Sequence, residues 1–175
     1  MLETNIHYPT ESWLIRDGLR KMLEMCSRLA ADNNILDGWR QHEHLWEKVK
    51  QLDRRINRIA AKKGPNYVGR MKPIHSKLLQ KAAIITQRAR EFRISLCLPK
   101  ATADDIFGPN TLQAFIARTE RVMDTATRRM IKCEFVPHSD KRFSVFEPHT
   151  QLYKRGKAGK PMPFGRQVFP CREAI

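Results

Sequence analysis

Apolar residues recur every three or four positions over four stretches of the chain, which is the spacing of one face of an α-helix. The stretches are 11–31, 35–62, 73–98 and 111–131. Their apolar positions are Leu14, Ile15, Leu19, Met22, Cys26 and Leu29 in the first, Leu36, Trp39, Leu45, Trp46, Val49, Leu52, Ile56 and Ile59 in the second, Ile74, Leu78, Ala82, Ile85, Ala89, Phe92 and Leu96 in the third, and Leu112, Phe115, Ile116, Val122, Met123, Ala126 and Met130 in the fourth. The pattern predicts four amphipathic helices.

Turn and capping residues set the expected ends of these helices. Thr10 is a suitable N-cap for the first helix, and Pro9 keeps the chain extended before it. The run KKGPNYVG ends the second helix, because Gly and Pro together mark a turn. A short turn between two long helices favours an antiparallel hairpin. The run ATADDIFGPN (101–110) is expected to be a loop before the fourth helix.

The pattern changes after residue 131. Phe143 and Val145 alternate with Ser144 and Phe146, which predicts a short strand that ends at Pro148. A second short strand is expected near 165–169, after a Gly- and Lys-rich loop. We therefore divide the chain into 1–10, the remnant of a first strand and its turn, 11–131, a helical block, and 132–175, hairpin-like short strands around the basic loop. The expected fold class is mainly α with a small β part (α+β).

Positive charge is concentrated in two segments. The formal net charge is +15 at pH 7, from 33 Lys and Arg against 18 Asp and Glu. Residues 51–100 hold 13 cations and 2 carboxylates, and residues 151–175 hold 6 and 1, whereas the rest of the chain nearly balances. Such clusters favour a polyanionic partner, because each cation placed on a phosphate releases counterions. A solvated helix face is the alternative interpretation.

The cations expected to contact nucleic acid come from both segments. One group follows the polar face of the second helix. The other lies in the loop KRGKAGK, which lacks the Gly-Lys-Ser/Thr ending of a P-loop but places cations on main chain that can approach a phosphate closely. A merely solvated loop is the alternative there. The predicted nucleic-acid-binding residues are Arg54, Arg55, Arg58, Lys62, Lys63, Lys154, Arg155, Lys157 and Lys160.

No metal site is expected from the cysteines or histidines. The four cysteines lie far apart, without the close pairs that zinc ligation needs. Cys26 and Cys97 fall at apolar positions and are expected to be buried thiols. His42 and His44 are two residues apart, so on a helix they face different directions and cannot share a metal. His7, His75, His138 and His149 are isolated in the sequence and are expected at the surface or in caps, with His149 a partial exception because Glu147 lies beside it at a strand end. No apolar run approaches the length of a membrane span, so a cytoplasmic location is expected.

Three stretches together resemble bacterial insertion-sequence transposases of the DDE type. They are LETNIHYPTES with the following helix to Leu14, the run HSDKRFSVFEPHTQLYKRGKAGKPMPFGRQV (138–168), and the basic helical block between them. The resemblance covers nearly the whole chain in order, and its most specific parts are TNIHYPT and FSVFEPHTQLYKRGKAGKP. It implies a long helical hairpin inserted in an incomplete RNase-H-like domain.

The resemblance also implies what chemistry to expect. In the family, three carboxylates bind the Mg²⁺ ions that drive DNA strand cleavage and transfer. The resemblance places the first catalytic Asp before Leu2, and the second Asp and the Glu after Ile175. Glu3, Glu11 and Glu147 match positions outside this triad. The chain is therefore expected to be an inactive transposase fragment with no catalytic residue, no metal site and no retained cofactor, which still binds DNA.

Two other interpretations stay open. The first is a stand-alone basic helical protein that binds nucleic acid, or interferes with an intact transposase by pairing with it. The second is a polypeptide that does not fold stably, because unpaired strand edges favour aggregation. The partners expected from the sequence are DNA, and an intact transposase or a second copy of the chain, but no membrane.

Overall fold

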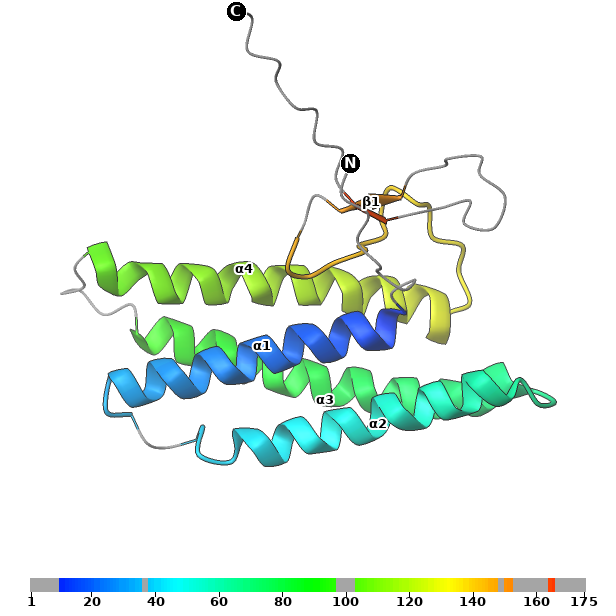
Figure 1. The fold of residues 1–175 in the computed structure, drawn as a ribbon, viewed down its shortest axis with the longest axis horizontal. Coiled ribbons are helices and arrows are strands. Elements are labelled where there is room, and N and C mark those ends of the chain that lie inside the picture. The colour runs from blue at the N-terminus through cyan, green and yellow to red at the C-terminus, as the bar shows by residue number, and fades with distance from the viewer. Residues whose placement is uncertain (1–9, 36–37, 97–102, 148–149, 153–163, 166–175) are drawn as a thin grey trace, which may run out of the picture.

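Four long helices dominate the computed structural model, which describes residues 10–35, 38–96, 103–147, 150–152 and 164–165. They are α1 (Glu11–Asp32), α2 (His42–Lys62), α3 (Tyr67–Leu96) and α4 (Ala103–Ala126), and α4 continues into a π-helical turn, η1 (Thr127–Ile131). Two short strands, β1 (Gln151–Leu152) and β2 (Phe164–Gly165), pair antiparallel beside the helices (Figure 1). The structure is a helical bundle with one minimal strand pair.

The helices pack around one shared core. α1 and α3 each contact the other three helices, whereas α2 and α4 contact α1 and α3 but, among the described residues, not each other. α2 and α4 therefore lie on opposite sides of the bundle. The α2–α3 turn extends past the ends of α1 and α4 (Figure 1). This arrangement leaves the outer face of the α2–α3 pair uncovered by the rest of the bundle.

The helical pattern in the sequence identified most of the core. In α1, the predicted residues Leu14, Ile15, Leu19, Met22 and Cys26 are all buried. The predicted positions of α3 and α4 are also buried or partly buried in the same core. Thr10 is the N-cap of α1, where its hydroxyl accepts a hydrogen bond from the Trp13 backbone N–H at 3.3 Å. These predictions are confirmed.

The predicted fold class is wrong. It described an α+β fold, with a long helical hairpin inserted in an incomplete RNase-H-like domain. The described residues instead form an all-helical bundle, and their single strand pair joins only Gln151 with Gly165 and Leu152 with Phe164. A pairing of two residues per strand cannot form the sheet of an RNase-H-like domain.

The strand predicted at Phe143 to Phe146 is also absent from the described structure. Val145 is buried in the helical core instead of on a sheet. Arg118 of α4 donates to the backbone carbonyls of Val145 at 3.2 Å and Phe146 at 3.4 Å. A side chain thus takes the place of a neighbouring strand as hydrogen-bond partner. The alternation of apolar residues reflects docking onto α4.

Three helix ends differ from the sequence-based expectation. α2 begins at His42, not near residue 35, because Gly38 has a φ of +94° and the chain turns there. α3 begins at Tyr67, so Pro73 lies inside the helix and not at its start. Met71, in the turn before this proline, is buried. α4 includes Pro109 and most of the predicted loop. A Cβ at Gly108 would lie 2.7 Å from Leu29 of α1, so close helix packing outweighs the turn signal of Gly-Pro.

Cys26 is a buried thiol, as predicted. It is fully buried in α1, and burial raises its pKa to about 12, against a smaller opposing effect of Arg88. Such a thiol stays protonated and is a poor nucleophile or metal ligand. Its role is therefore packing.

A small polar cluster lies inside the bundle between α1, α2 and α3. The Arg16 guanidinium of α1 donates to Asp53 Oδ2 of α2 at 3.0 Å, and only 2% of the Asp53 side chain is exposed. His75 of α3 is buried nearby, so its expected surface or capping position is wrong, and neither its Nδ1 nor Asp53 Oδ1 has a hydrogen-bond partner among the described residues. The Arg16–Asp53 ion pair joins α1 to α2 inside the bundle, and His75 of α3 adds a second buried titratable group beside it.

Acidification is expected to destabilise the fold through His75. Burial lowers the pKa of His75 below its usual value of 6.5, although Asp53 opposes the shift. The unfolded chain therefore binds the proton more readily, so this stability is complete above about pH 6.5 and is lost as the pH falls toward the folded-state pKa. One histidine contributes at most about 1.4 kcal/mol per pH unit.

Urea unfolding at about pH 7.5 and pH 5 measures this effect. His75→Leu is expected to reduce the pH dependence, whereas His44→Gln, at an exposed position of α2, is expected to leave it unchanged. An equal pH dependence in wild type and His75→Leu contradicts the assignment to His75.

Candidate nucleic-acid interface

A groove runs along the outer face of the α2–α3 pair. It has a volume of about 390 Å³ and is lined from α2 by Lys48, Gln51, Leu52 and Arg55 and from α3 by Lys77, Gln80, Lys81 and Ile84. In each helix the lining residues follow the three- and four-residue spacing of one helical face. The two faces meet because the turn at residues 63–66 folds the hairpin back on itself.

The groove is positively charged without local compensation. Lys48, Arg55, Lys77 and Lys81 line it, and among the described residues no carboxylate does. Within the described part of the chain, none of these four cations takes part in an ion pair or a side-chain hydrogen bond. The sequence contains no Asp or Glu between Asp53 and Glu91. The four cations are therefore available to a bound anion.

Of the five cations predicted on and after α2, only some lie on the same face as the groove. Arg55 lines the groove, and Arg58 and Lys62 continue its row at helical spacing, both exposed. Arg54 does not line the groove, and it pairs with Glu47 at 3.6 Å. Lys50 pairs with the same carboxylate at 3.2 Å. Lys63 is exposed at the C-cap of α2, with a φ of 41°. Three of the five thus share one face with the groove.

The other predicted cations cannot be placed relative to the groove. Lys154, Arg155, Lys157 and Lys160 lie outside the described residues. Their contribution stays a prediction from the sequence.

Sequence reasoning missed the α3 side of the groove. Lys77 and Lys81 of α3, and also Lys48 of α2, were not among the predicted binding residues. The position of the turn could have predicted these residues, because antiparallel helices bring together positions that are equidistant from the turn between them. Arg55 and Lys77 are equidistant from Asn66, and so are Gln51 and Lys81. The turn and the lysine spacing together indicate the groove.

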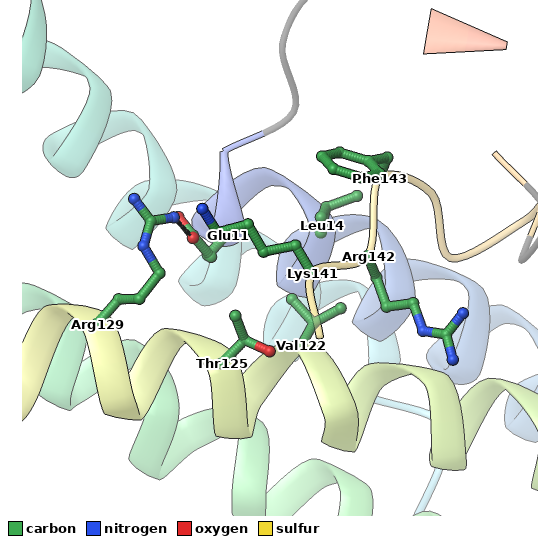
Figure 2. A pocket seen from close by; sticks show the side chains of 8 residues that line it. All are labelled: Glu11, Leu14, Val122, Thr125, Arg129, Lys141, Arg142 and Phe143. Carbon is green, nitrogen blue, oxygen red and sulfur yellow. Dashed lines mark hydrogen bonds and ion pairs between the residues drawn. The ribbon is translucent and has the colours of Figure 1, made fainter. Parts of the chain in front are cut away.

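A second hollow lies between α1, α4 and the segment that follows η1 (Figure 2). Leu14 and Val122 form its floor, the Arg129 guanidinium meets the Glu11 carboxylate at one side, and Lys141 lies across it. Its volume is about 10 Å³, which suffices for about one water molecule. This hollow is a packing feature between the bundle and the trailing segment.

Among the described residues, no group of three or more His, Cys, Asp or Glu side chains is placed to hold a metal ion. No helix in the same part of the chain combines the length and apolar character needed to cross a membrane.

Comparisons with protein-family models, with curated proteins and with solved structures each give no match to the chain. The comparisons assign no family. The transposase resemblance therefore stays a prediction from the sequence stretches that carry it.

Proposed function

We propose that the chain binds DNA through the α2–α3 groove, as a DNA-binding part of an insertion-sequence transposase. The observation that carries this proposal is the row of four cations along a groove where the described residues provide neither ion-pair partners nor carboxylates. The sequence stretches that resemble transposases favour DNA over other polyanions. A cytoplasmic location, where bacterial DNA lies, belongs to the same proposal.

The chemistry of the groove favours contact with the phosphate backbone. Its cations reach out from both helices, and two glutamines beside them can donate to phosphate oxygens. No aromatic side chain of the described part of the chain lines the groove, so these residues offer no base stacking there. Contacts to phosphates carry affinity but no direct sequence information. We therefore expect binding with little sequence preference inside the groove.

The groove has a length suited to a few nucleotides. Lys48 and Arg55 lie about 10 Å apart along α2 at a rise of 1.5 Å per residue. This distance corresponds to about three base pairs at 3.4 Å each. Four cations can thus neutralise neighbouring phosphates within one short stretch of backbone.

Fluorescence anisotropy with two unrelated duplexes of about 20 base pairs tests the proposal. With four phosphate contacts, the affinity is expected to fall about 150-fold between 50 and 200 mM salt, and to be similar for both sequences. Absence of binding at about 50 mM salt contradicts the proposal. A stand-alone binding protein would use the same groove, so this experiment tests binding in either setting.

Binding, not strand cleavage, is the activity proposed for this chain. Incubation of the pure protein with supercoiled plasmid and Mg²⁺ is expected to leave the plasmid intact. Reproducible nicking contradicts that part of the proposal.

A further inference from the structure

The tip of the α2–α3 hairpin carries a second kind of surface. Tyr67 and Val68 begin α3 with 36% and 48% of their areas exposed. The surrounding cations are Lys62, Lys63, Arg70 and Lys72, all exposed. The tip therefore combines one aromatic ring and an apolar neighbour with local positive charge, whereas the groove offers charge without an aromatic ring.

The conformation of the tip is set by its own backbone. Lys63 and Asn66 both have positive φ values, 41° and 49°, which are uncommon for non-glycine residues and occur at helix C-caps and in turns. The Tyr67 N–H donates to the Gly64 carbonyl at 3.2 Å, and the Arg70 N–H donates to the Asn66 carbonyl at 3.1 Å. A Cβ at Gly64 would lie 3.0 Å from the Arg70 guanidinium, so Arg70 folds over the turn. Tyr67 is thus presented from a defined turn.

The position of the tip suits a partner that is already held in the groove. The tip extends past α1 and α4, and the rest of the bundle does not cover it (Figure 1). Tyr67 lies about 15 Å from Lys77 along α3, at a rise of 1.5 Å per residue. This separation corresponds to about four base pairs of DNA. A strand that follows the groove can therefore reach the tip within a few nucleotides.

We propose that the tip binds unpaired nucleobases adjacent to the duplex held in the groove, by stacking on Tyr67 with Val68 as an additional apolar contact. The inference rests on the proposed function, since the groove cations place the DNA. Stacking needs a base with an accessible face, which a continuous duplex does not offer. The protein therefore favours DNA in which duplex and single strand meet.

Binding of three DNA probes tests this inference. They are a blunt duplex of about 20 base pairs, the same duplex with a single-stranded extension of about four nucleotides, and the extension strand alone. Wild type is expected to bind the extended duplex about 5- to 150-fold more tightly than the blunt one, the range for stacking one base on an aromatic ring. Tyr67→Ala is expected to remove this preference and leave blunt-duplex affinity within about twofold. Tyr67→Phe retains the ring and the preference.

A fluorescent base in the extension gives an independent readout. Stacking on Tyr67 is expected to quench 2-aminopurine placed in the extension, and Tyr67→Ala is expected to restore its fluorescence. Phe135→Ala is the matched control, because Phe135 is 86% exposed but lies in the segment after η1. Thermal melting followed by circular dichroism verifies that each variant is folded, and Val68→Ser provides a second change at the tip.

The outcomes separate the two proposals. Equal affinity for blunt and extended duplexes, or a preference that survives Tyr67→Ala, overturns the role of the tip while the groove stands. Loss of blunt-duplex binding in wild type at low salt overturns both.

Discussion

Arg16→Met is expected to lower the free energy of unfolding by about 3–5 kcal/mol. The change removes the guanidinium that lies 3.0 Å from Asp53 and leaves a carboxylate buried without its countercharge. Methionine keeps much of the aliphatic stem, so the loss is chiefly electrostatic. Urea denaturation at pH 7 measures the effect.

A pair of further variants separates the buried charge from lost packing. Arg16→Met combined with Asp53→Leu is expected to recover most of the stability, because no charge is left in the interior. Arg20→Met, one turn further along α1, removes an exposed cation that lies 3.5 Å from Glu24 and is expected to cost less than about 0.5 kcal/mol. A double variant no more stable than Arg16→Met contradicts this account.

Replacing all four groove cations by glutamine is expected to weaken DNA binding by roughly 30- to 900-fold at low salt. This range corresponds to about 0.5–1 kcal/mol for each of the four exposed contacts. The variant carries Lys48→Gln, Arg55→Gln, Lys77→Gln and Lys81→Gln. The slope of log affinity against log salt is also expected to flatten by about 3.6, since each phosphate contact contributes about 0.9. Anisotropy over a salt series measures both quantities.

A charge-matched variant controls for the change in net charge. Glutamine replacements at four exposed cations of α1, α4 and the segment after η1 remove the same charge away from the groove. These positions are Arg20, Arg28, Arg121 and Lys132. This variant is expected to retain most of the affinity and of the salt slope. Equal losses in the two variants would show that overall charge, and not the groove, attracts the DNA.

The sequence predicted the helices because helical burial follows a local rule. Apolar residues at three- and four-residue spacing form one helix face, which is buried against any apolar surface. Leu19, Leu78 and Ile116 are buried in this way in the bundle. The Thr10 cap and the hairpin turn are equally local. Boundaries that depend on contacts between distant segments were less predictable. Gly108 sits in α4 because Leu29 packs against it, and no local signal shows that contact.

The error in fold class has a related cause. The alternation at Phe143 and Val145 is compatible with a strand, but a strand requires a neighbour, and here Arg118 binds the carbonyls instead. The resemblance to transposases then favoured a sheet that the described residues do not form. A period of two in apolar residues shows that alternate positions are buried, and it does not show against what.

Only part of the candidate site could be predicted from the sequence, because the rest depends on which segments pack together. The charge excess of residues 51–100 located the right part of the chain, and Arg55 was chosen from the polar face of α2. Which cations share a groove depends on how α2 and α3 pair. That pairing brings in Lys77 and Lys81 and separates Arg54, which Glu47 binds.

The acid-free stretch between Asp53 and Glu91 also has a consequence for the hairpin itself. Its two helices bring like charges to the same groove, and salt screens such charges only over roughly 10 Å. The helices therefore repel each other along that edge, and apolar packing beneath must outweigh the repulsion. A polyanion in the groove converts the repulsion into attraction, and by linkage it stabilises the folded hairpin as it binds. Binding of a polyanion to the groove and the stability of the α2–α3 pair are then thermodynamically coupled.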